Sequence, residues 1–144
     1  MVLDTNVVSE LMRRQPEPLV LAWVDSQPPD DLWLTSVIAA ELLFGIARLP
    51  DGARKRQLTV AVASMLEQDF AGRVLAFDLT AASVYAQMVA DRERSGSGVA
   101  MADAQIAATC VAHGATLVTR NQKHFEGWGL TLIDPWQSGA ASRQ

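Results

Sequence analysis

The sequence predicts an α/β protein in which a mainly parallel sheet of short strands lies between two layers of helices. Short apolar segments alternate along the chain with longer segments of helical periodicity, which is the pattern of parallel strands joined by helical crossovers. The 144 residues suit one domain, and 49% of them are hydrophobic while 19% are charged. We therefore expect one folded domain over residues 1–137 and a disordered tail at 138–144.

The first half of the chain predicts two strands and four helices. In chain order these are a strand at 1–3, helices at 9–14 and 19–25, a strand at 32–34, and helices at 36–49 and 53–69. Pro16 and Pro18 separate the first two helices, and Pro50-Asp51-Gly52 ends the third. The fourth is amphipathic and carries its apolar side chains on one face, at Leu58, Val62, Met65 and Leu66.

The second half predicts three strands and two helices. They are a strand at 73–77, helices at 80–94 and 101–112, and strands at 116–119 and 130–133. Thr80 is the expected cap of the first of these helices, and the run Ser95-Gly96-Ser97-Gly98 separates it from the second. Gly114 is the expected stop of the second helix.

Composition narrows the classes of protein that the chain can represent. A lone cysteine, Cys110, cannot form an internal disulfide, and charged residues interrupt every apolar run before it reaches membrane-spanning length. The first residues lack the pattern of a signal peptide, so we expect a cytoplasmic protein without a membrane partner. The net charge of −4 is unusual for a protein that binds nucleic acid. A site built from carboxylates would nevertheless be anionic until cations bind to it.

Three acidic residues stand alone in otherwise uncharged stretches. Asp4 is the only charged residue before Glu10, and Asp103 is the only formal charge between Ser95 and Thr119. Glu41 lies in the middle of a predicted helix that is apolar nearly all round, which indicates a buried helix. A buried carboxylate is unfavourable unless it is paired with a cation, and no basic residue adjoins any of the three in sequence.

The predicted elements bring these carboxylates toward one end of the sheet. Asp4 ends the first strand, Asp103 falls in the first turn of its helix, and Glu41 lies one to two turns into a helix that follows the second strand. Such a group of hard oxygen ligands selects Mg²⁺ or Mn²⁺ and suits phosphoryl chemistry. Simpler explanations stay open for each residue: capping for Asp4, the helix dipole for Asp103, and a distant ion pair for Glu41.

Four motifs, in order along nearly the whole chain, resemble those of the PIN-domain family. They are the segments Leu3–Leu11, Thr35–Gly45, Ala102–Ala108 and Leu117–Asn121, the last together with His124-Phe125. Within that family the sequence looks like the VapC-like toxins, including their FitB-like branch, to which the ending Asp134-Pro135-Trp136 is also similar. The resemblance implies an α/β/α PIN-like nuclease domain.

The same resemblance implies an activity and partners. It implies a Mg²⁺- or Mn²⁺-dependent endoribonuclease in which water activated by the metal cleaves the RNA phosphodiester, with Asp4, Glu41 and Asp103 as metal ligands and catalytic residues. It also implies the toxin of a type II toxin–antitoxin pair, whose small antitoxin binds DNA and blocks the toxin's active site. Homodimers and larger assemblies are usual in this group. Apolar side chains at Leu11, Met12, Trp23, Leu43 and Phe44 could form a groove for such partners or pack in the core.

The sequence departs from the family pattern at one position. Many members carry a fourth acidic residue in the loop after the last core strand, where this chain has Asn121 and His124. Asn121 can offer a carbonyl oxygen or orient a water molecule, so we include it among the candidate catalytic residues. Its lack of charge favours an alternative, a catalytically weak PIN-fold protein that acts through an antitoxin and DNA complex. A phosphatase with Asp4 as nucleophile is less favoured, because Asn6 stands where a second aspartate is needed.

Overall fold

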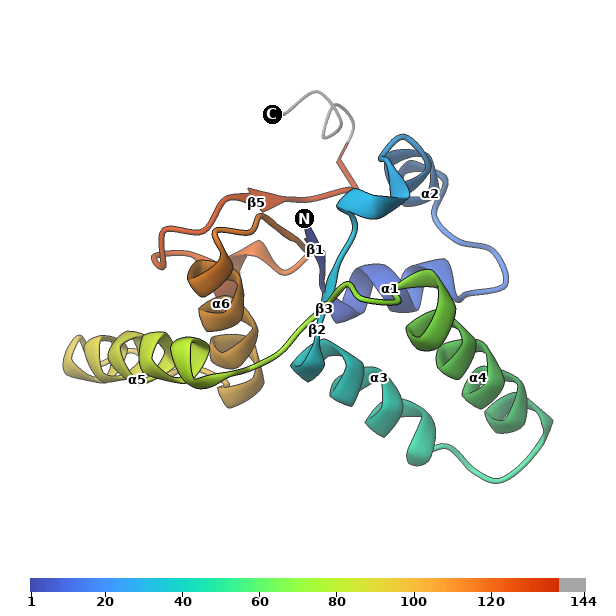
Figure 1. The fold of residues 1–144 in the computed structure, drawn as a ribbon, viewed down its shortest axis with the longest axis horizontal. Coiled ribbons are helices and arrows are strands. Elements are labelled where there is room, and N and C mark those ends of the chain that lie inside the picture. Colours follow the sequence, from blue (N-terminus) through green and yellow to red (C-terminus); the bar gives the residue numbers. More distant parts are fainter. Residues whose placement is uncertain (138–144) are drawn as a thin grey trace.

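The structure is a computed structural model that describes residues 1–137, so the expected tail at 138–144 lies outside the described residues. In chain order the elements of the described part are β1 (Val2–Leu3), α1 (Thr5–Leu11), α2 (Pro18–Asp25), η1 (Pro29–Asp31), β2 (Leu34–Thr35), α3 (Ser36–Ala47), α4 (Ala53–Ser64), η2 (Met65–Asp69), β3 (Val74–Leu75), α5 (Leu79–Arg94), α6 (Met101–His113), β4 (Leu117–Val118), η3 (Gln122–Phe125) and β5 (Leu132–Ile133). Figure 1 shows α5 and α6 on one side of the short strands and α1, α3 and α4 on the other. The predicted α/β/α arrangement with a short-stranded sheet is confirmed.

The strands form one parallel sheet that winds in two directions from β1. Strands β1, β4 and β5 pair in that order, and β2 pairs with β3. A parallel bridge between Val2 and Trp33 joins the two groups, and the Leu3 N–H donates to the Trp33 carbonyl at 2.9 Å. The resulting order is β3-β2-β1-β4-β5, so the winding reverses between β1 and β4. Ligand sites of open α/β sheets lie at such a reversal, beyond the carboxyl ends of the strands.

Aspartate caps set the starts of two helices and correct their predicted limits. Helix α1 begins earlier than expected, because the Asp4 side chain accepts a hydrogen bond from the Thr5 N–H at 2.8 Å. Helix α5 is capped by Asp78, which accepts from the Ala81 N–H at 3.0 Å, so the prediction of Thr80 as the cap was wrong. In both cases an aspartate one position before the helix supplies the acceptor that the free first-turn N–H groups need.

The ends of the other helices follow the predicted stops closely. Helix α6 ends at Gly114, whose φ of 63° is the left-handed conformation that glycine adopts readily. The predicted helix over 53–69 is α4 followed by the π-helical turn η2, and its side chain Val62 is buried as expected.

The apolar core lies between the sheet and the helices that flank it. It includes β1 and β4 together with the inward side chains of α6, Ile106, Ala107 and Cys110. Trp23 joins this core with 4% of its surface exposed. Within residues 1–137, the helices are all too short or too polar to cross a bilayer.

Helix α3 corrects one expectation about burial. Only Ile38, Leu42 and Ile46 are buried in it, whereas Leu43 is 49% and Phe44 65% exposed. Because α3 packs through one face only, its apolar composition does not reflect complete burial. The exposed face instead offers an apolar surface.

Candidate active site

Asp4 lies where β1 ends and α1 begins, at the reversal point of the sheet. Its backbone continues the strand pairing, with the Asp4 N–H donating to the Val118 carbonyl at 2.9 Å. Its side chain is held on both oxygens: Oδ1 accepts from the Thr5 N–H, and Oδ2 accepts from the Thr119 hydroxyl at 2.8 Å. Only 5% of Asp4 is exposed. The adjacent parallel strands β1 and β4 thus end on two polar residues that contact each other.

The environment of Asp4 favours its neutral form. Burial raises the pKa of Asp4 from 3.8 to about 6, while the hydrogen bonds from Thr119 and the Thr5 N–H act in the opposite direction. The charges of Glu41 and Asp103 raise the pKa further. Both carboxylates are therefore near enough to Asp4 for mutual repulsion, and a cation placed among the three would relieve it.

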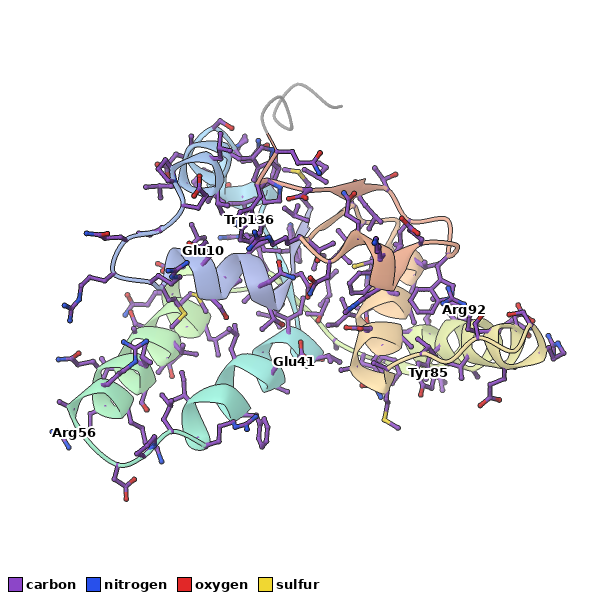
Figure 2. The ribbon with its side chains drawn as sticks, turned by 180° about the vertical axis from the view of Figure 1, so that it is seen from behind. Glu10, Glu41, Arg56, Tyr85, Arg92 and Trp136 are labelled. Atoms are coloured by element: carbon purple, nitrogen blue, oxygen red, sulfur yellow. The ribbon has the colours of Figure 1, made fainter. Side chains whose placement is uncertain are left out.

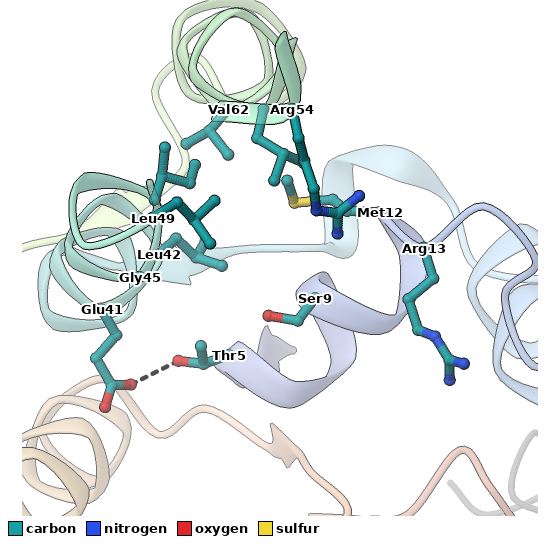
Figure 3. Close-up of a pocket in the computed structure, with 12 residues that line it drawn as sticks. Thr5, Ser9, Met12, Arg13, Glu41, Leu42, Gly45, Leu49, Arg54 and Val62 are labelled. Carbon is teal, nitrogen blue, oxygen red and sulfur yellow. Dashed lines mark hydrogen bonds between the residues drawn. The ribbon is translucent and has the colours of Figure 1, made fainter. Parts of the chain in front are cut away.

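Glu41 reaches this region from the middle of α3, on the side of the helix that faces the first turn of α1 (Figure 2). The Thr5 hydroxyl donates to Glu41 Oε1 at 2.5 Å, which ties the side chain to the first turn of α1. Figure 3 shows this hydrogen bond at one end of a cavity between α1, α3 and α4. The cavity measures about 340 Å³, and its other walls include Leu42, Met12 and Arg54. Glu41 therefore belongs to the group of three carboxylates, with Asp4 and Asp103, and also lines a largely apolar cavity.

Asp103 occupies the first turn of α6, as predicted. Its Oδ2 lies 3.3 Å from His124 Nδ1, and the Asp103 side chain is 24% exposed while that of His124 is 58% exposed. His124 comes from η3, the short helix that follows β4. The contact fixes the position of Asp103 relative to the loop beyond β4.

Asn121 lies next to this loop but its side chain does not join the carboxylates. Its backbone N–H donates to Thr119 Oγ1 at 3.0 Å, and its carbonyl accepts from the His124 N–H at 3.0 Å. The Asn121 side chain is exposed, and in the described part of the chain it makes no hydrogen bond. Of the two residues at the position of the family's fourth acid, His124 is the one in contact with Asp103. A role for Asn121 stays a prediction.

Small polar side chains surround Asp4 and the start of α3. Asn6 donates to Thr119 Oγ1 at 3.1 Å and lies 3.4 Å from Asp4 Oδ2. Thr35 serves as a helix cap, since its hydroxyl accepts from the Ile38 N–H at 3.1 Å. Thr119, which is fully buried, was missed. Its signal is the one that identified Asp4, a polar residue directly after a short apolar strand.

The donor set suits a hard divalent cation, although the carboxylates stand apart. Asp4 and Glu41 form no ion pair with a Lys or Arg side chain of residues 1–137. Within the same residues, no three His, Cys, Asp or Glu side chains are grouped closely enough to hold a metal ion as they stand. The oxygen chemistry and the repulsion around Asp4 fit Mg²⁺ or Mn²⁺. Side-chain movement of Glu41 or Asp103 would have to complete the coordination.

Comparison with known proteins assigns this fold to a family. The model of the PIN domain matches residues 1–126. The chain therefore belongs to the PIN-domain family, as its four motifs predicted.

Individual relatives narrow the assignment within that family. The chain is 44% identical to the VapC ribonuclease Y4jK of Sinorhizobium fredii, over 94% of this chain and 97% of the relative. It is 38% identical to the toxin FitB of Neisseria gonorrhoeae, over 94% and 97% of the two chains. The solved structure of FitAB bound to the IR36 DNA fragment matches with a TM-score of 0.87 and 38% identity, over 94% of this chain and 95% of that chain. The similarity is thus to VapC- and FitB-type proteins along nearly the whole length.

Proposed function

We propose that the protein is a metal-dependent endoribonuclease and the toxin of a type II toxin–antitoxin pair. The observation that carries this proposal is that Glu41 and Asp103 approach the buried Asp4 from two helices at the reversal point of the sheet, near enough for their charges to raise its pKa. Similarity to a VapC ribonuclease and to the toxin FitB supports the same conclusion. A buried carboxylate with two like charges nearby is unfavourable for folding alone, so Asp4 indicates a site that is kept for binding a cation.

Asp4, Glu41 and Asp103 would hold Mg²⁺ or Mn²⁺, and the surrounding residues keep them in position. The Thr5 hydroxyl orients Glu41, the Thr119 hydroxyl orients Asp4, and the His124 ring orients Asp103. Bound there, a divalent cation would supply a lowered pKa for a water nucleophile and stabilisation of charge on the phosphate. Because burial raises the pKa of Asp4 to about 6, this carboxylate is mostly ionised in the metal-free protein only above that pH.

RNA cleavage by the Glu41→Gln variant tests the proposed activity. The wild type should cleave single-stranded RNA in Mg²⁺ or Mn²⁺ and stop when EDTA is added. Glu41→Gln should lose cleavage, because the amide keeps the shape of the side chain but not its charge. Glu67→Gln is the matched control, since Glu67 is exposed on η2, and it should cleave normally. Undiminished cleavage by Glu41→Gln, or cleavage by the wild type in EDTA, would contradict the proposal.

We further propose that the partner is a small DNA-binding antitoxin, part of which covers the carboxylates. The name of the toxin FitB and the DNA-bound structure of FitAB support a partner and an assembly of this kind. The cavity beside Glu41 is largely apolar and opens next to the site, so a segment seated there would lie against Glu41 (Figure 3). The exposed apolar side chains Leu43 and Phe44 support a further protein contact, and a homodimer stays a prediction.

The product of a short reading frame beside the gene provides the test of the partner. Added in equimolar amount, this purified protein should stop RNA cleavage and should bind the DNA upstream of the two genes together with the toxin. Cleavage that continues at full rate in the presence of the neighbouring product would contradict the proposed pairing.

A catalytically weak binding protein is the second candidate, and two observations favour it. Neither Asn121 nor His124 supplies a fourth carboxylate, and the described acidic side chains are not closely grouped. A wild type that binds the partner and the DNA, but cleaves RNA no faster than Glu41→Gln, would establish this alternative.

A further inference from the structure

A second cavity is lined by Asp103 but by neither Asp4 nor Glu41. It measures about 270 Å³ and opens between α5, the segment that leads into α6, and η3. Its walls include the side chains of Arg92, Asp103, Lys123 and His124 and the residues 98–100. We call this cavity the Arg92 pocket.

The Arg92 pocket gathers positive charge in a chain whose net charge is −4. Arg92 and Lys123 are both cationic at neutral pH, and neither forms an ion pair within residues 1–137. The carboxylate of the wall, Asp103, contacts His124 instead. The pocket therefore presents cationic donors that no acidic side chain of the described chain occupies, which suits an anionic ligand.

Arg92 is held in place before any ligand arrives. Its guanidinium carbon lies 4.2 Å from the centre of the Trp128 ring, and its Nη2 donates to the Glu126 carbonyl at 2.9 Å. Gly127, with a φ of 87°, makes the turn that lets both neighbours reach Arg92. Two contacts thus fix one face and one nitrogen of the guanidinium. The remaining N–H groups keep a fixed direction, which lowers the entropy lost when they bind an oxyanion.

The position of the pocket identifies the anion that it fits. Asp103 borders the Arg92 pocket and also belongs to the carboxylate group, where its charge acts on Asp4. An RNA strand carries one phosphate per nucleotide, so a phosphodiester held at the carboxylates has another phosphate one nucleotide away along the strand. We propose that the Arg92 pocket binds the phosphodiester group next to the one that is cleaved, an inference that rests on the proposed ribonuclease function.

Such a site would set the position of the strand without reading its sequence. Contacts to phosphates fix the register of a nucleic acid, whereas contacts to base edges carry specificity. Arg92 and Lys123 would therefore act on every RNA substrate alike. They would also compensate locally for the repulsion between the RNA and the carboxylates.

RNA binding in a background that does not cleave tests the pocket apart from the activity. The probe is a short fluorescein-labelled single-stranded RNA with a 5′-hydroxyl end, and anisotropy in Mg²⁺ gives its affinity for Glu41→Gln at several salt concentrations. Adding Arg92→Gln or Lys123→Gln should weaken binding about 5- to 10-fold each. Each should also reduce the dependence of log affinity on log salt by about 0.7, the value for one phosphate contact on a single strand.

Arg56→Gln in the same background is the matched control, because it also removes one positive charge from an arginine. Arg56 lies on α4, at the opposite end of the molecule from Arg92 (Figure 2), and it should leave both the affinity and the salt dependence unchanged. Lys123 is exposed, so Lys123→Gln keeps the test valid if Arg92→Gln disturbs the packing on Trp128. Pocket variants that bind RNA as the control does would overturn the proposal.

Inorganic phosphate distinguishes an internal phosphodiester from a free or terminal phosphate. If phosphate shifts the amide resonances of 98–100 while RNA binding is independent of Arg92 and Lys123, the pocket binds free phosphate and the proposal fails. The outcome for the ribonuclease function is separate. If the wild type cleaves RNA but the pocket variants bind RNA as the control does, only the proposal for the Arg92 pocket fails. If RNA binding depends on Arg92 but the wild type does not cleave RNA, only the proposed ribonuclease activity fails.

Discussion

Replacing Asp4 with Asn should stabilise the metal-free protein at neutral pH, by an amount that depends on pH. The pKa of Asp4 is raised by burial from 3.8 to about 6, so the folded protein holds this proton more tightly than the unfolded chain does. Ionisation of Asp4 therefore lowers the stability of the fold. The loss is small below about pH 4, grows between pH 4 and 6, and stays constant above pH 6. The difference between the two pKa values corresponds to about 3 kcal/mol at pH 7.

Asparagine removes this loss and retains the contact that caps α1. It is as good a helix cap as aspartate, so the Thr5 N–H keeps its acceptor. The Thr119 oxygen already accepts hydrogen bonds from the Asn6 side chain and the Asn121 N–H, so an amide that keeps the cap cannot replace the bond that the hydroxyl donates to Asp4. The hydrogen bonds that are lost with the charge reduce the gain, so about 3 kcal/mol is the upper limit at pH 7.

Urea unfolding in EDTA between pH 4 and pH 7 measures the effect. The stability of Asp4→Asn minus that of the wild type should rise by about 2–3 kcal/mol over this interval, which corresponds to a melting difference on the order of 10 °C at neutral pH. Asp25→Asn is the control, since Asp25 is an exposed aspartate on α2, and its difference from the wild type should stay flat. An Asp4→Asn difference that does not change with pH would refute the reasoning.

Two further predictions concern the metal and the segment between α1 and α2. At about 100 times its dissociation constant, Mn²⁺ should stabilise the wild type by roughly 2.7 kcal/mol, and Asp103→Asn should lose most of this melting shift without melting lower in EDTA. A much lower melting temperature of Asp103→Asn in EDTA would instead make its contact with His124 structural. The pKa of Glu10 is lowered, first by the hydrogen bond from the Glu17 N–H at 2.9 Å and then by Arg13, so Glu10 stabilises the fold above its unfolded pKa and this stability is lost as the pH falls. Glu10→Gln should therefore reduce acid sensitivity and speed hydrogen exchange of the Glu17 amide, and an unchanged exchange rate would contradict this role.

The layers of the fold were predictable because periodicity and breakers determine them, whereas helix starts depend on single side chains. The strands and helices alternate as expected, but α1 begins at Thr5 because Asp4 caps it. Sequence reasoning had assigned two roles to Asp4 as alternatives, a cap and a site residue. The structure shows one oxygen capping α1 and the other contacting Thr119, so the same side chain serves the fold and faces the other carboxylates.

The isolation of the candidate carboxylates is visible in the sequence, but the contacts that support them are not. Asp4 is recognisable because no basic residue lies near it in the sequence. Its partner Thr119 follows it by 115 positions, and only the strand order brings the two together. The contact between Asp103 and His124 likewise depends on where η3 lies after β4. Such pairs leave no local signal in the sequence, since each member has an ordinary role within its own segment.

The acidic net charge and the proposed RNA substrate are compatible because charge is separated within the site. Burial and the charges of Glu41 and Asp103 disfavour the anionic form of Asp4. The three carboxylates together repel an approaching phosphate until a divalent cation reverses the local sign of the charge. The cationic side chains of Arg92 and Lys123 line the adjoining Arg92 pocket, which shares Asp103 with this group. RNA affinity would then consist of one part that requires the cation and one part that does not. A chain with a pI near 5.0 can bind an anionic strand in this way, because the cationic groups are needed only along the path of the strand and not over the whole surface.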